Sequence, residues 1–182
     1  MTGRVQVYCG CSLDGFIAGE GDDLSWLPDP PDGDDGGFGA FMAGIGAILM
    51  GRRTYDILAG FDAELWPYGE VPMLVATHRP LDPIRPTIRA VEGSIESLVQ
   101  AAGEVAGERG VYIDGGILVR EALDAGLVDE ITVTVVPAIL GRGVPLFAGA
   151  ATRRTLERTA VRPIDGGMTQ LVYRVRRPVP GG

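Results

Sequence analysis

Two strand-to-helix junctions with glycine at the turn constrain this chain more than any other feature of its sequence. The first reads AILMGRRTYD over residues 47–56, and the second reads VYIDGGILV over residues 111–119. In each, a short apolar run typical of a buried strand stops at glycine, and an amphipathic helix begins. Free N–H groups and the positive end of the helix dipole then face the carboxyl edge of a sheet, which suits a phosphate. Two such junctions on one sheet can hold the two phosphate-bearing ends of a dinucleotide, so the sequence favours a nucleotide-cofactor enzyme.

The order of the other elements predicts an α/β fold. Strands are expected at residues 5–9, 47–50, 73–76, 87–91, 111–113 and 131–136, helices at 38–44, 54–59, 95–106 and 117–125, and a closing hairpin at 156–164 and 168–175. Alternating strands and helices followed by a hairpin predict three layers: a mostly parallel central sheet, helices on both faces and an antiparallel C-terminal hairpin. A single domain is expected over residues 1–177, with a frayed tail at 178–182.

The composition excludes several classes of function. The net charge of −8 gives no global support for a nucleic-acid partner. All 16 basic residues are arginine, which rules out lysine Schiff-base chemistry and a P-loop lysine. Arginine is therefore the only permanent cation available to a phosphate.

The cysteines and the termini point to a reducing compartment. Cys9 and Cys11 stand two apart on one expected strand, so they share a face as core residues and cannot form an unstrained disulfide. Two cysteines and one histidine do not make a zinc site, and no metal is expected. Residues 1–7 lack the features of a signal peptide, and the longest apolar stretch, 38–50, is too short to cross a bilayer. The expected location is cytoplasmic, away from membranes.

Each junction also has a plain structural interpretation. Two glycines after a strand let a pyrophosphate approach the backbone at residues 114–116, but they also suit a tight turn. At residues 51–54, Arg52, Arg53 and Thr54 can bind phosphate, or Thr54 can cap a helix whose arginines are solvated. The GxGxxG fingerprint is absent, so a standard Rossmann site is not expected.

Taken together, the motifs resemble a known superfamily. Met-Gly-Arg-x-Thr-Tyr at residues 50–55 and strand-x-Gly-Gly at 114–116 resemble the dihydrofolate reductase superfamily. SLDGFIA at residues 12–18 and PAILGRGVPLF at residues 137–147 are similar to the branch formed by the C-terminal reductase domain of bacterial riboflavin biosynthesis proteins. The resemblance covers about residues 4–176. Since no deaminase domain precedes it, the chain looks like a stand-alone member.

That resemblance implies NADPH as the cofactor. By position, the residues implied to bind it are Ile17, Ala18 and Gly19 along the nicotinamide, Gly51, Arg52, Arg53 and Thr54 at phosphates, Thr77, His78 and Arg79 at the adenosine part, and Ile113, Gly115, Gly116, Ile117 and Leu118 around the pyrophosphate and nicotinamide. Arg52 and Arg79 are the implied partners of a 2′-phosphate. His78, the one histidine, also fits an ordinary surface loop.

The substrate side offers carboxylates and aromatic rings. Asp35 is near the position implied for a ring-binding carboxylate, although it lies in an acidic, glycine-rich loop where solvated charge is common. Asp14, in the Leu-Asp-Gly pattern, can bind substrate or stabilise the turn at Gly15. The rings that can wall a planar substrate, or simply belong to the core, are Tyr8, Trp26, Phe38 and Phe41. The proton is expected from water, Asp14 or Asp35.

The resulting expectation is an NADPH-dependent oxidoreductase that transfers a hydride to a pterin-like or ribosylaminopyrimidine-like small molecule. The alternative is a nucleotide-binding module of this fold without turnover. A hydrolase is disfavoured because no Gly-x-Ser-x-Gly occurs. The resemblance also implies a homodimer, with the strand at 131–136 or the final hairpin as the contact.

Overall fold

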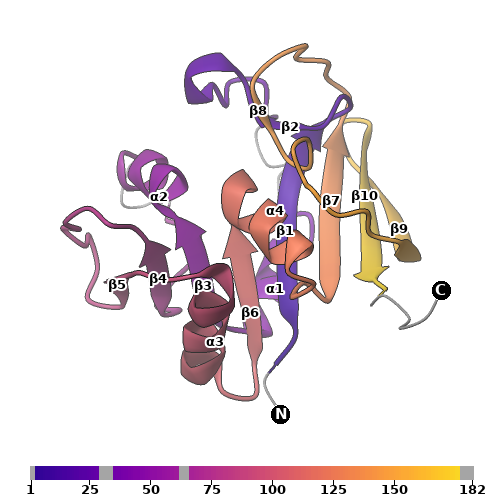
Figure 1. Ribbon diagram of the computed structural model, residues 1–182. Coiled ribbons are helices and arrows are strands. Elements are labelled where there is room, and N and C mark those ends of the chain that lie inside the picture. Colours follow the sequence, from indigo (N-terminus) through magenta and orange to yellow (C-terminus); the bar gives the residue numbers. More distant parts are fainter. Residues whose placement is uncertain (1–2, 29–34, 62–65, 177–182) are drawn as a thin grey trace.

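The computed structural model describes residues 3–28, 35–61 and 66–176. Its main feature is an eight-stranded sheet, with helices on both faces (Figure 1). The strands of the sheet are β1 (Val5–Ser12), β3 (Ile45–Gly51), β4 (Met73–Ala76), β5 (Ile88–Val91), β6 (Gly110–Asp114), β7 (Glu130–Val136), β9 (Leu156–Ile164) and β10 (Met168–Val175). Their order is β5-β4-β3-β6-β1-β7-β10-β9. The pairs from β5 to β7 are parallel, and β10 runs antiparallel to both of its neighbours. The predicted α/β architecture and closing hairpin are confirmed.

Within the described residues, four α-helices cover the two faces. They are α1 (Phe38–Ala43), α2 (Arg52–Ala59), α3 (Ile95–Ala106) and α4 (Gly116–Asp124). Side chains alternate along β3: Ala47 and Leu49 pack in one cluster with α3 and α4, while Ile48 and Met50 pack in the other with α1 and α2. Because both faces of the central strands are covered, these strands are apolar throughout, as buried parallel strands are.

A small second sheet lies beside the carboxyl ends of the strands. It pairs β2 (Phe16–Ala18) with β8 (Val144–Pro145), and the short 3-10 helix η1 (Glu20–Asp22) follows β2. Gly143 has a φ of +147°, and a Cβ there would stand 2.1 Å from the Ala18 carbonyl oxygen. The close approach of these two segments therefore requires glycine.

Local signals in the sequence set several element ends. The Ser94 hydroxyl accepts a hydrogen bond from the Ser97 N–H, so the predicted cap of α3 is confirmed. The final hairpin has the predicted bounds around residues 165–167. Several elements are longer than expected. Among them, β1 extends to Ser12, which pairs with Val136 of β7, and α2 begins at Arg52 directly after β3.

One expectation about the sheet is wrong. The strand at 131–136 was a candidate edge for a dimer contact, but β7 lies between β1 and β10 and has no free edge. The edges of the sheet are β5 and β9, so the final hairpin is the remaining candidate for the dimer, which stays a prediction. The expected tail at 178–182 lies outside the described residues.

Cys9 and Cys11 are free thiols that pack in the same cluster, on the face covered by α3 and α4, as their spacing predicts. Over the described ranges, no helix is both long and apolar enough to cross a bilayer. The same ranges contain no group of three or more His, Cys, Asp or Glu side chains that could bind a metal ion.

Candidate functional site

The two glycine junctions lie side by side. The strands that lead into them, β3 and β6, are neighbours in the sheet, with Met50 opposite Asp114. A Cβ added at Gly115 would lie 2.8 Å from Thr54 Oγ1 and 3.6 Å from the Gly51 nitrogen. Gly115 also has a φ of +104°, in the region that favours glycine. The two junctions are therefore adjacent at one edge of the sheet, while their binding of one anionic ligand stays a prediction.

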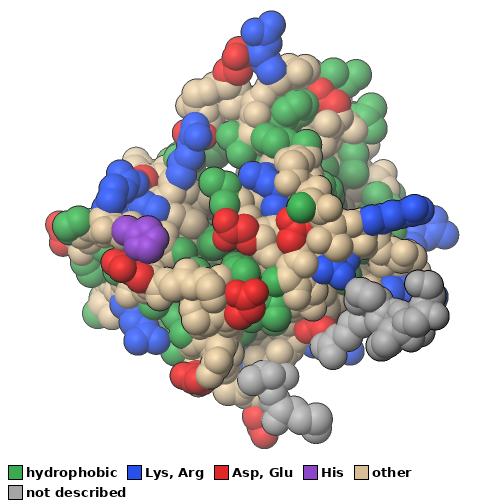
Figure 2. All heavy atoms as spheres, viewed as in Figure 1, with side chains coloured by type: hydrophobic (Ala, Val, Ile, Leu, Met, Phe, Trp, Pro, Cys, Tyr) green, Lys and Arg blue, Asp and Glu red, His purple; other side chains and the backbone are tan. Residues whose placement is uncertain are grey.

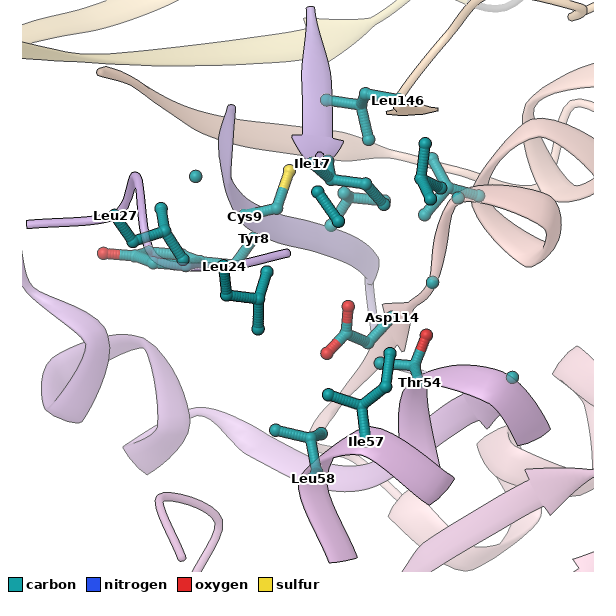
Figure 3. Close-up of a pocket in the computed structure, with 18 of the residues that line it drawn as sticks. Tyr8, Cys9, Ile17, Leu24, Leu27, Thr54, Ile57, Leu58, Asp114 and Leu146 are labelled. Atoms are coloured by element: carbon teal, nitrogen blue, oxygen red, sulfur yellow. The ribbon is translucent and has the colours of Figure 1, made fainter. Parts of the chain in front are cut away.

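Both junctions open into one cleft of about 900 Å³ (Figure 3). The first contributes residues 51–54 to its lining and the second contributes 114–119. The lining also includes residues 7–10 of β1, residues 17 and 18 of β2, and Leu24 and Leu27 of the loop after η1. The cleft thus lies at the carboxyl end of the parallel strands, where open α/β sheets bind ligands.

Two helices begin at this cleft, and the first turn of each presents backbone N–H groups without intrahelical partners. A Cβ at Gly51 would meet only Leu118, at 3.9 Å, so the backbone of the first junction is open to a ligand. Gly116 is different, because a Cβ there would stand 2.9 Å from the Pro145 carbonyl oxygen and 3.0 Å from Arg120 Nη1. The absence of a side chain at Gly51 keeps the backbone open to a ligand, whereas at Gly116 it also allows close packing against Pro145 and Arg120.

An arginine pair lies beside the start of α2. Asp56 bridges it: its Oδ1 is 2.7 Å from Arg52 Nε, and its Oδ2 is 3.2 Å from Arg79 Nη2. Arg52 also donates to the Pro80 carbonyl oxygen at 2.8 Å. Two guanidinium groups held around one carboxylate leave a net positive charge, so this cluster suits an anion.

Among the neighbouring polar residues, Arg53 and His78 are exposed, whereas Thr77 is buried. Arg53 pairs with Asp22 of η1 at 2.8 Å, which connects α2 to the segment after β2. The Thr77 hydroxyl accepts the Arg79 N–H at 3.0 Å. His78 is 84% exposed, with Nδ1 3.3 Å from Glu92 Oε2, and it is the single purple side chain at the surface in Figure 2. His78 therefore lies in a surface loop, which was the alternative to a cofactor contact in the sequence analysis.

The cleft brings together most of the residues expected at the cofactor. Those in its lining are Ile17, Ala18, Gly51, Arg52, Arg53, Thr54, Gly115, Gly116, Ile117 and Leu118. Gly19, Thr77, His78 and Arg79 lie outside the lining, the last beside Arg52. Ile113 does not fit its expected role, because it is 0% exposed and packs in the cluster under α3 and α4. Alternation along β6 directs its side chain away from the cleft.

Asp114, which the sequence expectations left without a role, is the carboxylate at the centre of the cleft (Figure 3). Tyr68 donates its hydroxyl to Asp114 Oδ2 at 3.1 Å. Burial raises the pKa of the Asp114 carboxyl above its ordinary value, because it disfavours the charged form, while hydrogen bonds from Tyr68 and Tyr112 oppose the shift. A charged residue at the end of an apolar strand, directly before Gly-Gly, was the signal that could have identified it.

Asp14 lies outside the cleft lining and holds loops together. It accepts a hydrogen bond from the Ser12 hydroxyl at 2.6 Å and from the N–H groups of Leu140 and Gly141 at 3.1 and 2.7 Å. These bonds, the one from Ser12 first, lower the pKa of the Asp14 carboxyl. Of the two roles considered for Asp14, the structure therefore favours stabilisation of the turn over substrate binding. Because the carboxyl is ionised, it is also a poor proton donor.

Asp35 lines the cleft, but its oxygens serve the start of α1. They accept the N–H groups of Gly39 at 2.6 Å and Gly37 at 2.8 Å, and these bonds lower the pKa of the Asp35 carboxyl. Asp35 is therefore an ionised group at the rim of the cleft. Asp34, adjacent in sequence, lies outside the described residues.

Only some of the expected aromatic residues reach the cleft. Tyr8 and Phe38 line it, and their rings meet edge to face at 5.5 Å between centroids. Phe41 stacks on Tyr8 at 4.7 Å but is not in the lining. Trp26 is also outside the lining and donates its indole N–H to the Asp23 carbonyl oxygen at 3.1 Å. Tyr68, which lines the cleft, was not expected.

A buried glutamine fixes Tyr8 in place. Gln170 is 0% exposed and donates to the Tyr8 hydroxyl at 2.9 Å, to the Gly36 carbonyl oxygen at 2.8 Å and to Thr134 Oγ1 at 3.2 Å. The Tyr8 hydroxyl in turn donates to Gly36 at 2.6 Å. Such a satisfied polar network rigidifies its surroundings, so the wall that Tyr8 forms is preorganised.

Comparison with known families gives one family match. The family described as RibD C-terminal domain matches residues 59–170. The matched segment runs from the end of α2 into β10 and includes the second glycine junction.

Individual relatives and solved structures are similar to this chain over nearly its whole length. A crystal structure of a candidate riboflavin biosynthesis protein from Shewanella sp. PV-4 is 29% identical, with a TM-score of 0.84 over 96% of this chain and 99% of that chain. The uncharacterized protein YyaP of Bacillus subtilis (strain 168) is 27% identical over 180 residues, which are 93% of this chain and 94% of YyaP. Dihydrofolate reductase from Enterococcus faecalis, solved with NADP(H), shares the fold at 18% identity, with a TM-score of 0.68 over 97% of this chain and 99% of that one.

Proposed function

The chain belongs to the RibD C-terminal domain family, and on that premise we propose that it is an NADPH-dependent reductase that transfers a hydride to a pterin-like or ribosylaminopyrimidine-like ring. Its reductase-like fold agrees with this activity. The observation that carries the proposal is the single cleft into which both glycine junctions open.

The residues of the cleft fit a dinucleotide. α2 and α4 begin directly after the adjacent strands β3 and β6, and their N-termini offer backbone N–H groups to the two phosphate-bearing parts of the dinucleotide. Arg52 and Arg79, already gathered around Asp56, would hold a 2′-phosphate, which selects NADPH over NADH. Ile17 and Ala18 on β2 would bound the nicotinamide end. When bound, the reduced nicotinamide supplies the hydride.

The chain itself orients the acceptor ring, excludes water and holds a proton. Tyr8 and Phe38 provide a preorganised aromatic wall. Leu24, Leu27 and Leu58 are apolar neighbours that keep water from the reacting atoms (Figure 3). Asp114 is the group suited to hold the proton at its carboxyl oxygen, because burial favours its neutral form.

A substitution at Gly51 tests the cofactor site. The variant Gly51→Val puts a side chain into the open part of the cleft, where a Cβ meets only Leu118 at 3.9 Å. We expect the dissociation constant for NADPH, measured by quenching of tryptophan emission, to rise about tenfold or more, a loss of at least about 1.4 kcal/mol. Gly44→Ala, outside the cleft lining, is the matched control, and thermal unfolding of both variants checks that the fold is kept.

Turnover is tested separately. NADPH oxidation is followed with dihydrofolate, the ribosylaminopyrimidine phosphate, its dephosphorylated form and flavins. Failure of the unaltered protein to bind NADPH would contradict the proposal. Tight NADPH binding without oxidation of any ring in this set would favour a binding module instead.

A further inference from the structure

One end of the cleft is built from aromatic rings and a carboxylate. We call it the aromatic end, formed by Tyr8, Phe38, Tyr68 and Asp114. Tyr8 and Phe38 meet at 5.5 Å between ring centroids, and Phe38 and Tyr68 meet at 6.1 Å, both edge to face. Tyr68 donates to Asp114 at 3.1 Å. A contiguous aromatic wall ending in an acceptor suits a flat ring with a polar N–H edge.

The charged side chains among the described lining residues are distributed unevenly along the cleft. The acids are Asp22, Asp35 and Asp114. The only lining cations within the described part of the chain are Arg52 and Arg53, which both stand in the first turn of α2. Each is already paired with a carboxylate, Arg52 with Asp56 and Arg53 with Asp22. The cations therefore belong to the junction proposed for the cofactor, and the aromatic end carries acids.

Other arginines lie nearby without lining the cleft. Arg162 of β9 stands behind the turn before α1, where a Cβ on Gly37 would be 3.1 Å from its Nη2, and it donates to Gln170. Arg85 covers the Trp66 ring at 5.5 Å. By sequence alone, the internal segments 29–34 and 62–65 contain acids but no arginine or lysine, so neither can supply a cation.

Resting on the reductase function proposed above, we propose that the aromatic end accepts a flat heterocycle that is uncharged or cationic, and that it discriminates against the same ring carrying a phosphate or carboxylate. An anion placed beside the Asp35 carboxylate, which lines the same cleft, would be desolvated and repelled, and both effects cost free energy. A neutral or protonated ring nitrogen instead gains Asp114 as a hydrogen-bond partner.

Riboflavin and FMN make a matched pair of probes, because they differ only in the phosphate. Each is titrated, by flavin fluorescence, into protein saturated with NADP⁺, so that the cofactor site is filled. We expect riboflavin to bind about tenfold or more tightly than FMN. The dephosphorylated ribosylaminopyrimidine should likewise bind more tightly than its phosphate in a calorimetric titration.

A charge-adding variant separates charge from size. Leu27 lines the cleft and is 38% exposed, so Leu27→Arg introduces a cation at little cost to the core. We expect Leu27→Arg to bind FMN at least as tightly as riboflavin. Leu27→Gln is the uncharged control and should keep the original preference.

If the unaltered protein bound FMN as tightly as riboflavin, or more tightly, the proposal would be overturned. If that FMN binding were then lost in the variant Arg162→Gln, Arg162 would be the cation that binds the phosphate. Binding of neither flavin and neither pyrimidine would also overturn it. Both results leave the reductase function standing as long as NADP⁺ binds. Failure of NADP⁺ to bind contradicts the function itself, and so the two failures are distinguishable.

Discussion

At the scale of single residues, the burial of Asp114 affects both the stability of the protein and the protonation of the carboxyl. Its burial costs stability whenever the carboxyl is charged, yet the same burial prepares it to hold a proton in the cleft. Because its folded-state pKa lies above the ordinary carboxyl value, its contribution to stability is present at low pH and is lost as the pH rises through the raised pKa. At neutral pH, a charged Asp114 would therefore lower the stability of the folded protein.

The variant Asp114→Asn tests the effects of this carboxyl on stability and on hydride transfer. The amide oxygen can still accept the Tyr68 hydroxyl, and the buried charge is removed. We expect a melting temperature at neutral pH equal to or above that of the unaltered protein, together with about a hundredfold or greater loss in the rate of hydride transfer. Thermal unfolding and stopped-flow oxidation of NADPH measure the two effects. An unchanged rate would remove Asp114 from the proposed role.

Asp56 predicts a second effect at the residue scale. It occupies the arginine pair that the proposal assigns to the 2′-phosphate, and so it competes with that phosphate. For Asp56→Asn, the ratio of NADH to NADPH dissociation constants should increase about two- to fivefold, since exposed ion pairs are weak. Arg79→Ala should decrease the same ratio. Equal effects on both cofactors in either variant would show that this cluster does not recognise the 2′-phosphate.

At the scale of elements, the sequence predicted most strands and helices because their signals are local. Apolar runs, the Ser94 cap and the glycines after strands each act within a few residues. The extra length of β1 depends instead on its pairing with β7, which is distant in sequence. The role of Asp14 was open for the same reason, since its partners Leu140 and Gly141 lie more than a hundred residues away.

Asp14 should therefore matter for stability. Its pKa is lowered in the folded protein, so its contribution is present above the ordinary carboxyl pKa and is lost as the pH falls through the lowered value. Asp14→Asn is expected to lower the melting temperature at neutral pH, with the difference from the unaltered protein closing in acid, and to leave NADPH affinity nearly unchanged. A pH series of thermal scans checks this. A variant with unaltered stability and abolished hydride transfer would restore Asp14 as a catalytic candidate.

At the scale of the whole molecule, the cleft depends on the strand order. β6 lies between β3 and β1, and this crossover puts the second glycine junction directly beside the first. The sequence identified both junctions, because each has its own local motif. It could not show that Ile113 faces the core or that Tyr68 reaches Asp114, because both depend on how distant segments pack.

We propose that two adjacent backbone turns hold one dinucleotide, and a crystal structure of the protein with NADPH is the decisive test. We expect electron density for the pyrophosphate against residues 51–54 and 115–118, with the nicotinamide beside Ile17 and the 2′-phosphate between Arg52 and Arg79. Density for the coenzyme anywhere else, or none at these turns under saturating NADPH, would contradict it.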